Sequence, residues 1–586
     1  MQKDIEGESE RSRDAPDATE AVHPVEILRE AVESYGPYLQ PSGEMHDPVF
    51  GEPTQYGTPY HALCNAVLAR GDGGEGRSGY LDRAVRGLEA ALDHVSDPGL
   101  PPTVSGFDPA TGAVTRSNHR DFFWPPILKT FRILRNMGVD APESFARRIA
   151  GVDIERAFAQ RPPSNWAAVW LSGEWLRLRE GLSPFSTEKI DLWLDAFFDA
   201  HILTEQGFYQ EPGHPNSYDL FTRYHLADML MEGYDGRRRE DLEHLLRTGL
   251  HRSLGVQLSD GSLASAHRST GQTWTLGAQC AYFTHAANHF RGRDQGLARH
   301  AGEAAYRALS SFRRWQRRGG PYSPVENCLP PGHRVGYERY TADGHYANLA
   351  AALLAVAVLN GLDRPFTEPS GGREASLRLE HDPTYRAVLH NGAYSVHINA
   401  RPAPDYDAFG LIDLTFGPGR FLHFASVAKH VESGRLLNLG MSGRPAPASQ
   451  GDLVLIGRME RYGTPVGLRL EARDRGSPHR YRLAARVETE GVYVEEATPG
   501  LEEPKTLLVP YLRDPGTGTV TEARVEAGSV RLVHGGEEVD ISYSAPVKRV
   551  VHLTGGFESR RGLCGVLRVE FRKESERISY RIQALR

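Results

Sequence analysis

The segment DRPFTEPSGGREA, residues 363–375, divides the 586-residue chain into two parts with different patterning. Its prolines and glycines predict a linker, because both residue types interrupt helices and strands. Before the linker, apolar residues recur at the spacing of helices, and after it they alternate as in strands. The sequence therefore predicts an α+β protein with more than one domain.

The part before the linker predicts about a dozen helices, many of which begin at Pro, Ser, Thr or Asp and end near Gly. ILRNMG at 133–138 and VLNGL at 358–362 are two such ends. The helices follow one another at near-regular intervals, with longer loops between alternate pairs. This rhythm favours an (α/α) toroid, an incomplete barrel, over residues 23–362, with its long loops forming a cleft at one end. A plain α-solenoid would give a similar pattern.

The part after the linker predicts short strands separated by turns. AYSVHINA at 393–400 and RISYRIQAL at 577–585 alternate apolar and polar residues, and turn dipeptides such as Gly535-Gly536 fit antiparallel meanders. We therefore expect an antiparallel β-sandwich over residues 376–586.

Composition narrows the class of partner. The net charge of −7 gives no overall drive toward nucleic acid or anionic membrane. Residues 1–22 are polar, which predicts a disordered tail without the apolar core of a secretory signal. No run of about 18 apolar residues occurs, so we expect a cytoplasmic protein that does not span a membrane.

Cofactor and metal motifs are also missing from the sequence. The four cysteines are far apart and form no C-x-x-C pair, which argues against a disulfide framework or a zinc site and indicates a reducing compartment. His423 and His430 match no metal-binding spacing, and no P-loop or post-strand GxGxxG occurs. We expect neither a metal nor a cofactor.

The densest group of candidate functional residues lies in QGFYQEPGHPNSYDLFTRYHLA, residues 206–227. Glycines and prolines make its first half a loop, and from Ser217 the pattern is helical. A loop that leads into a helix N-terminus suits an anionic ligand, because unpaired backbone N–H groups point outward there. The candidate side chains are Tyr209, Glu211, His214, Tyr218, Arg223, Tyr224 and His225.

Two further segments place polar groups beside aromatic rings. SNHRDFFWPP at 117–126 and HRVGYERYTADGHY at 333–346 each lead into a predicted helix. Aromatic platforms beside polar groups suit sugar stacking, although ordinary packing at a helix start explains them equally well. Their candidate substrate-binding residues are His119, Asp121, Trp124, Arg334, Tyr337, Glu338, Tyr340 and His345.

Three segments, in order along the chain, resemble the uncharacterised bacterial family DUF2264. Ser164-Asn165-Trp166 resembles that family's N-N-W-R helix start, and residues 206–227 resemble its D-G-W-Y…D-Y-Y…F-H segment. DGSLASAHRSTGQTWTLGAQ at 260–279 resembles its D-G…G-R-S-L-T-Y-R-F-A segment, with Thr273 in place of the second arginine. The helical-then-β plan also resembles that of the heparinase and chondroitin/hyaluronate lyase-like polysaccharide lyases.

This resemblance implies a lyase that cleaves uronate-containing glycans by β-elimination. The C5 proton of a uronate is weakly acidic, so the adjacent carboxylate must be neutralised as the proton leaves. The resemblance suggests Asn165 as the carboxylate binder and Arg268 as the clamp. It suggests Tyr218 or Tyr224 as base and acid, and His214 or His225 as the imidazole partner. Trp274, in the third segment, is a further substrate-binding candidate.

Two alternatives remain open at the sequence level. A glycoside hydrolase built on the same toroid would use two carboxylates, with Glu211, Asp219, Asp121 and Glu338 as the available pool. A non-catalytic carbohydrate-binding protein would use the aromatic rings alone. All three hypotheses take an oligosaccharide or polysaccharide as the partner.

Overall fold

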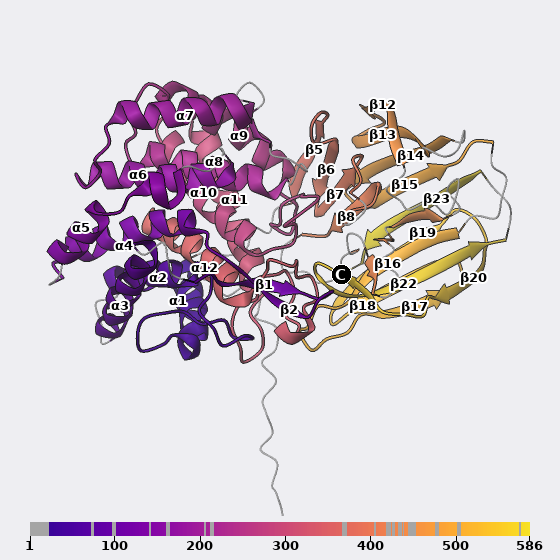
Figure 1. Ribbon diagram of the computed structural model, residues 1–586. Helices are drawn as coiled ribbons and strands as arrows, with labels where there is room; N and C mark the ends of the chain where they lie inside the picture. The colour runs from indigo at the N-terminus through magenta and orange to yellow at the C-terminus, as the bar shows by residue number, and fades with distance from the viewer. Residues whose placement is uncertain are drawn as a thin grey trace, which may run out of the picture.

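A computed structural model shows helices in the first part of the chain and antiparallel sheets in the second (Figure 1), as the sequence predicts. The last long helix ends at Leu359 and the first strand of the large sheets begins at Arg373. The structure describes residues 23–71, 76–96, 101–139, 142–159, 164–203, 207–210, 216–365, 372–403, 406–417, 424, 428–431, 436–437, 439–442, 453–474, 480–500, 506–572 and 576–585.

Six helices contact one another in sequence and close a ring, because the last also contacts the first. They are buried on nearly all sides, and they lack a continuous polar face, as the run NLAAALLAVAVL in the last one illustrates. These ring helices are α2 (Gly57–Gly71), α4 (Trp124–Asn136), α6 (Asn165–Arg179), α8 (Ser217–Met231), α10 (Trp274–Phe290) and α12 (Asp343–Leu359).

The remaining long helices alternate with the ring helices along the chain, and each packs against a ring helix next to it. In α11, for example, Leu297, Ala301, Ala305 and Phe312 are buried on one face while the opposite face is polar. These helices are α1 (Pro24–Tyr35), α3 (Arg77–Ser96), α5 (Pro142–Ala150), α7 (Thr187–His201), α9 (Arg239–Val256) and α11 (Gln295–Arg313).

A β-hairpin that the sequence patterns did not predict interrupts the helical part. Strands β1 (Thr103–Asp108) and β2 (Ala113–Ser117) pair antiparallel, and Phe107 N–H donates to the carbonyl oxygen of Arg339 at 2.8 Å. Gly106 permits this approach, since a Cβ there would lie 2.1 Å from the same oxygen. A second, minimal pair joins β3 (Ile202–Leu203) to β4 (Phe208–Tyr209).

The described residues of the second part of the chain form three antiparallel sheets. The first follows the order β5-β6-β7-β8, with β5 (Arg373–Glu380), β6 (Arg386–Gly392), β7 (Tyr394–Asn399) and β8 (Gly410–Thr415). The second follows the order β12-β13-β14-β15-β23-β19-β18-β17, with β12 (Leu453–Arg461), β13 (Val466–Asp474), β14 (Arg480–Glu488), β15 (Gly491–Ala497), β17 (Glu522–Glu526), β18 (Ser529–His534), β19 (Glu537–Tyr543) and β23 (Arg577–Ala584).

The third sheet follows the order β10-β9-β21-β22-β16-β11, with β20 also paired to β22. Its strands are β9 (Ala428–His430), β10 (Leu436–Leu437), β11 (Gly440–Ser442), β16 (Thr506–Asp514), β20 (Val547–His552), β21 (Phe557–Ser559) and β22 (Gly562–Phe571). One apolar core, which includes Leu389, Val396, Leu483 and Leu567, joins residues from all three sheets.

Buried ion pairs connect the helices to the sheets. Arg252 of α9 pairs with Glu380 of β5 at 2.6 Å, and Arg561 pairs with Glu326 at 2.8 Å, with all four side chains buried. Burial opposes the charged form of Glu380, but Arg252 and Arg386 outweigh it and lower the pKa of this carboxyl. A buried charge left without its partner is costly, so these pairs hold the two parts in one arrangement.

Candidate active site

At one end of the ring, aromatic side chains from the starts of α8 and α10 and from the residues just before α2 and α4 form a continuous band. The rings of Tyr56 and Phe122 stack at 4.9 Å, and those of Phe122 and Phe221 stack at 5.9 Å. Trp274 lies edge-on to Phe221 at 5.1 Å and meets Tyr218 at 5.6 Å. Helix dipoles that begin at one end favour negative charge there.

A chain of three hydroxyl groups crosses this end of the ring. The hydroxyl of Tyr218, at the start of α8, hydrogen-bonds Ser269 Oγ at 2.9 Å, and Ser269 Oγ hydrogen-bonds the Tyr340 hydroxyl at 2.6 Å. Tyr218 and Tyr340 are half-buried. Burial raises the pKa of Tyr340 well above its usual value. The three hydroxyls come from segments that precede or begin three different ring helices.

Arg268 brings a positive charge to Tyr218. Its guanidinium carbon lies 5.2 Å from the centre of the Tyr218 ring, a cation–π distance. The residues on either side of Arg268 have left-handed backbone conformations, with φ of 72° at His267 and 67° at Ser269. Side chains other than glycine rarely adopt this region, and each such residue costs on the order of 1 kcal/mol or more. Strain of this kind, held in place by its surroundings, is typical of functional loops.

Hydrogen bonds to acidic side chains hold the strained segment at both ends. Ser269 N–H donates to Glu338 Oε1 at 2.5 Å, and His267 N–H donates to Asp407, which lies in the sheet-containing part. Burial raises the pKa of Glu338, although Tyr340 and Arg560 act in the opposite direction. The position of Arg268 therefore depends on both parts of the chain.

A cavity of about 520 Å³ lies where the helices meet the sheets, next to the hydroxyl chain. Glu338 and Tyr340 belong to both the cavity wall and the hydrogen-bonded group around Ser269. Four cationic side chains and two glutamates line the cavity, so its lining carries a positive balance that suits an anionic ligand. The charged lining residues are Arg334, Arg339, Lys429, Arg560, Glu338 and Glu558.

The segment around His119 lies at the same end of the ring as the aromatic band. The His119 ring meets Trp166 edge-on at 4.2 Å and Phe122 at 6.2 Å, and its Nδ1 lies 4.0 Å from the buried Asp121 Oδ1. Asn165 is the first residue of α6 and is buried beside Trp166. The structure therefore places His119 next to the band that contains Tyr218, and Asn165 directly precedes the Trp166 that His119 contacts.

Several predicted site residues lie inside the helix packing instead. Arg223 is buried and pairs with Asp219 at 2.8 Å and with the Tyr282 hydroxyl at 2.8 Å. The Tyr224 ring stacks on His285 at 5.7 Å. Two more of them lie there as well: Tyr209 stacks on Phe197 at 5.9 Å, and Trp124 Nε1 donates to Glu174 at 2.9 Å. Tyr337, in contrast, lines the cavity of about 520 Å³, and its hydroxyl donates to Asp343 at 2.7 Å.

Two predicted histidines are buried and neutral at pH 7. Burial lowers the pKa of His225 to about 3, and its Nδ1 lies 3.1 Å from Ser172 Oγ. Burial likewise lowers the pKa of His345 to about 3, and its ring lies edge-on to Tyr56 at 4.8 Å. His225 is seven residues after Tyr218 on α8, so its Cα lies about 10 Å further along the helix axis than the Cα of Tyr218. Neither group supplies an imidazolium beside Tyr218 at neutral pH.

Arg334 lines the 520 Å³ cavity and donates to the Thr341 carbonyl oxygen at 2.9 Å. Glu211 and His214 lie outside the described residues. Among the residues that the structure describes, no group of three or more His, Cys, Asp or Glu side chains is arranged to hold a metal ion. No helix in the same residues is long and apolar enough to cross a membrane.

Sequence reasoning missed several residues that build this region. Tyr56 and Phe221 belong to the aromatic band, but aromatic residues at helix spacing look the same whether they fill a core or line a cleft. Asp407 and Arg560 hold the loop around Arg268 from more than one hundred residues away in sequence. No local pattern marks such distant partners.

No family model matches this sequence, and no curated protein matches it. Among solved structures, the chain is similar to a Streptomyces coelicolor A3 chondroitin AC lyase in complex with chondroitin sulphate, with 12% identity, a TM-score of 0.48, and coverage of 96% of this chain and 79% of that one. It is also similar to a Paenibacillus xanthan lyase (10% identity, TM-score 0.49, 96% and 57% coverage) and to heparinase III (10%, 0.39, 98% and 86%). Likeness at this level does not assign an activity to this chain.

Proposed function

We propose that this protein is a carbohydrate-active enzyme, a lyase that cleaves uronate-containing glycans by β-elimination. The observation that carries the proposal is the hydroxyl chain Tyr218–Ser269–Tyr340 with the Arg268 guanidinium over the Tyr218 ring. Under this proposal the closed ring of helices is an (α/α) toroid, and the sheets that share one core form a β-sandwich.

Tyr218 acts as base and then as acid. Its phenolate oxygen takes the C5 proton, the C5–H electron pair becomes the C4–C5 double bond, and the C4–O4 bond breaks. The leaving oxygen then takes the proton from Tyr218, so the enzyme returns to its starting state. A tyrosine with the usual pKa of about 10 needs help to ionise near neutral pH. Hydrogen bonding from Ser269 and the charge of Arg268 both favour the phenolate.

Arg268 and Asn165 bind the uronate carboxylate while C5 loses its proton. A guanidinium and an amide N–H stabilise negative charge as it develops on that carboxylate, which lowers the barrier most when the groups are already in position. The strained backbone around Arg268 and the burial of Asn165 at the start of α6 both support a preorganised arrangement. The aromatic band would hold the sugar ring by stacking.

A glycoside hydrolase is the second candidate, favoured by the raised pKa of Glu338, since a general acid must remain protonated. A hydrolase also needs an ionised carboxylate across the bond. Glu558 is the other carboxyl in the described cavity lining, and burial raises its pKa as well. Two carboxyls that both favour the neutral form support this mechanism less well than the tyrosine supports elimination.

The deciding experiment offers the protein a panel of uronate glycans and follows two products. Elimination creates an unsaturated uronate that absorbs ultraviolet light, and hydrolysis creates a reducing end without that absorbance. Because elimination breaks the C4–O4 bond, it also leaves a reducing end on the departing sugar, so we expect absorbance and reducing ends to rise together. Tyr218→Phe should lower the rate by about 100-fold or more, as for loss of an acid–base group. The matched control is Tyr306→Phe on α11, which removes a hydroxyl that donates to the carbonyl oxygen of Arg364.

Each other result has a defined meaning. Reducing ends without ultraviolet absorbance would identify a hydrolase, and Glu338→Gln would then abolish activity. If the protein binds the glycans but produces neither ultraviolet absorbance nor reducing ends, it would be a non-catalytic carbohydrate-binding protein. Full activity in Tyr218→Phe would remove Tyr218 from the mechanism.

A further inference from the structure

The eight-stranded sheet has one face that packs on the core and an opposite face that is accessible. The side chains of β14, β15 and β23 alternate between buried and accessible, so every second residue points away from the core. The accessible positions on these three strands carry five arginines and two glutamates, Glu488 and Glu495, and three of the arginines pair with Glu471 of β13 or with Glu495. The five arginines are Arg480, Arg482, Arg486, Arg577 and Arg581.

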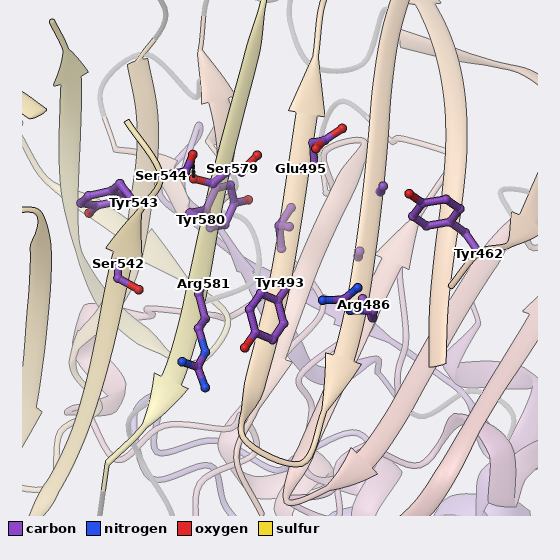
Figure 2. Close-up of a pocket in the computed structure, with 13 residues that line it drawn as sticks. Tyr462, Arg486, Tyr493, Glu495, Ser542, Tyr543, Ser544, Ser579, Tyr580 and Arg581 are labelled. Carbon is purple, nitrogen blue, oxygen red and sulfur yellow. Dashed lines mark hydrogen bonds between the residues drawn. The ribbon is translucent and has the colours of Figure 1, made fainter. Parts of the chain in front are cut away.

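At the middle of this face, one tyrosine lies between two arginines. Arg486 on β14 is directly opposite Tyr493 on β15, and Tyr493 is directly opposite Arg581 on β23. Each guanidinium carbon lies 5.1 Å from the centre of the Tyr493 ring. Figure 2 shows the ring between the two guanidinium groups. Cation–π contacts on both sides hold the two charges in defined positions.

A hollow of about 410 Å³ surrounds this trio. The residues next to the trio on the same face are short on three strands, Ala484 on β14, Ser579 on β23 and Ser542 on β19, whereas Glu495 on β15 adds a carboxylate that pairs with Arg577 at 3.3 Å. The volume falls in the range of small-molecule sites, and the serine hydroxyls add hydrogen-bonding groups around the two charges.

The two guanidinium groups differ in how far they are neutralised. Arg486 pairs with Glu488 at 2.7 Å, and its side chain remains 42% exposed. Arg581 donates to the carbonyl oxygen of Glu490 at 3.2 Å, and no carboxylate in the described residues forms an ion pair with it. The Arg581 charge is thus available to an external anion.

We infer that this hollow is a second glycan-binding site, which takes a sugar carboxylate or sulfate on Arg581 and a further acidic group of the same chain near Arg486. Each guanidinium lies 5.1 Å from the ring centre, so the two are at most about 10 Å apart, within reach of one short oligosaccharide. Bidentate hydrogen bonds from arginine suit both carboxylate and sulfate oxygens. The site holds an anionic polymer at a distance from the ring of helices.

Single-stranded nucleic acid fits this hollow less well. Its binding sites depend on bases that stack on open aromatic faces. The Tyr493 ring already has a guanidinium carbon 5.1 Å from its centre on the strand to each side, which crowds a stacked base. An anionic sugar needs only the charges, the hydroxyls and the hollow.

The choice of ligand rests on the proposed function, but its test measures binding instead of cleavage. Chondroitin sulfate and heparin oligosaccharides of defined length are titrated into Tyr218→Phe protein, so that turnover does not consume them. The test variant adds Arg486→Gln and Arg581→Gln. The matched control adds Arg549→Gln and Arg568→Gln, which removes the same charge from two exposed arginines that pair with Glu570 on another sheet.

We expect the test variant to bind the oligosaccharide about tenfold more weakly, or to lose one of two binding events, while the control stays within about twofold of the parent. The salt dependence of binding should fall in the test variant only. Equal affinity and stoichiometry in the test variant and the parent would overturn the inference, as would the absence of binding in the parent. Single-stranded DNA that binds the hollow as tightly as the glycan would also overturn it.

Cleavage then separates this inference from the proposed function. With Tyr218 intact, the two arginine substitutions should slow cleavage of long chains and leave the shortest cleavable oligosaccharide unaffected. If the protein cleaves no glycan at all but the binding difference persists, the second site stands and the proposed function fails.

Discussion

Arg560 donates a 2.7 Å hydrogen bond to the carbonyl oxygen of His267, 293 residues earlier in the chain. The same guanidinium pairs with Asp407 at 3.2 Å, and Asp407 accepts the His267 N–H. The backbone of His267 is therefore held at both its N–H and its carbonyl by one ion pair from the sheet-containing part. This clamp fixes the left-handed turn that carries Arg268 toward Tyr218.

Asp407→Asn should weaken this clamp while keeping a side chain of nearly the same size and shape. The neutral amide no longer pairs with Arg560, so we expect the 267–269 backbone to move and turnover to fall by about 10- to 100-fold, as for a small misplacement of a catalytic group. Hydrogen exchange at residues 267–270 should rise. Arg549→Gln, on β20, is the control. Unchanged exchange together with unchanged turnover would show that the clamp does not position the loop.

Ser269→Gly separates the hydroxyl chain from the strained backbone. Glycine adopts a φ of 67° without penalty, so the relief of strain should offset the loss of two hydrogen bonds, and stability should change by less than about 1 kcal/mol. Activity should fall by about tenfold or more, because Tyr218 loses its partner. Ser269→Ala keeps the strain and lacks the hydroxyl, so its activity should fall equally. A loss in the glycine variant alone would instead implicate the backbone.

His225 should make the fold sensitive to acid. Its pKa is about 3 in the folded chain and about 6.5 when unfolded, so between these values the unfolded chain binds a proton that the folded chain does not. Stability therefore falls as the pH drops through this window, by roughly 2 kcal/mol between pH 7 and pH 5 from this group. His225→Gln should be less stable at pH 7, because the hydrogen bond between His225 Nδ1 and Ser172 Oγ is lost. Its free energy of unfolding should also fall less between pH 7 and pH 5 than that of the parent. Urea unfolding of the parent and the variant at pH 7 and pH 5 measures these free energies. An equal fall in the parent and the variant would contradict a lowered pKa of His225.

Two glycine-to-alanine substitutions in neighbouring helices should have opposite effects. A Cβ on Gly277 of α10 would lie 2.4 Å from the carbonyl oxygen of Ala350 on α12, so Gly277→Ala should destabilise the ring by about 1–3 kcal/mol. A Cβ on Gly302 of α11 would have no neighbouring atom within 4 Å, so Gly302→Ala should stabilise the protein by up to about 1 kcal/mol through helix propensity. Thermal unfolding of both variants tests this. A stabilised Gly277→Ala would mean that α10 and α12 are not in such close contact.

The sequence predicts the site residues that lie in the segments before the ring helices, but it does not predict which polar residues within a buried helix reach the site. Tyr218, Arg268, Glu338 and Tyr340 come together as a group, because each lies in a segment that leads into a ring helix. Arg223, Tyr224 and His225 lie elsewhere, because α8 is buried on all sides and its polar residues face other helices. A sequence pattern shows that a helix carries polar residues, but it does not show which neighbour they meet.

The spacing of apolar residues predicts that helices precede strands in this chain, because helical and extended backbones repeat their side-chain directions over a few residues. The boundary near residue 365 was visible for the same reason. The left-handed turn at His267 and Ser269 could not be read in that way, since it depends on Asp407, Glu338 and Arg560, all distant in sequence. The arginine pair around Tyr493 likewise exists only because three strands align in one register. Long-range contacts of this kind are set by the packing of the whole chain, and no short stretch of residues encodes them.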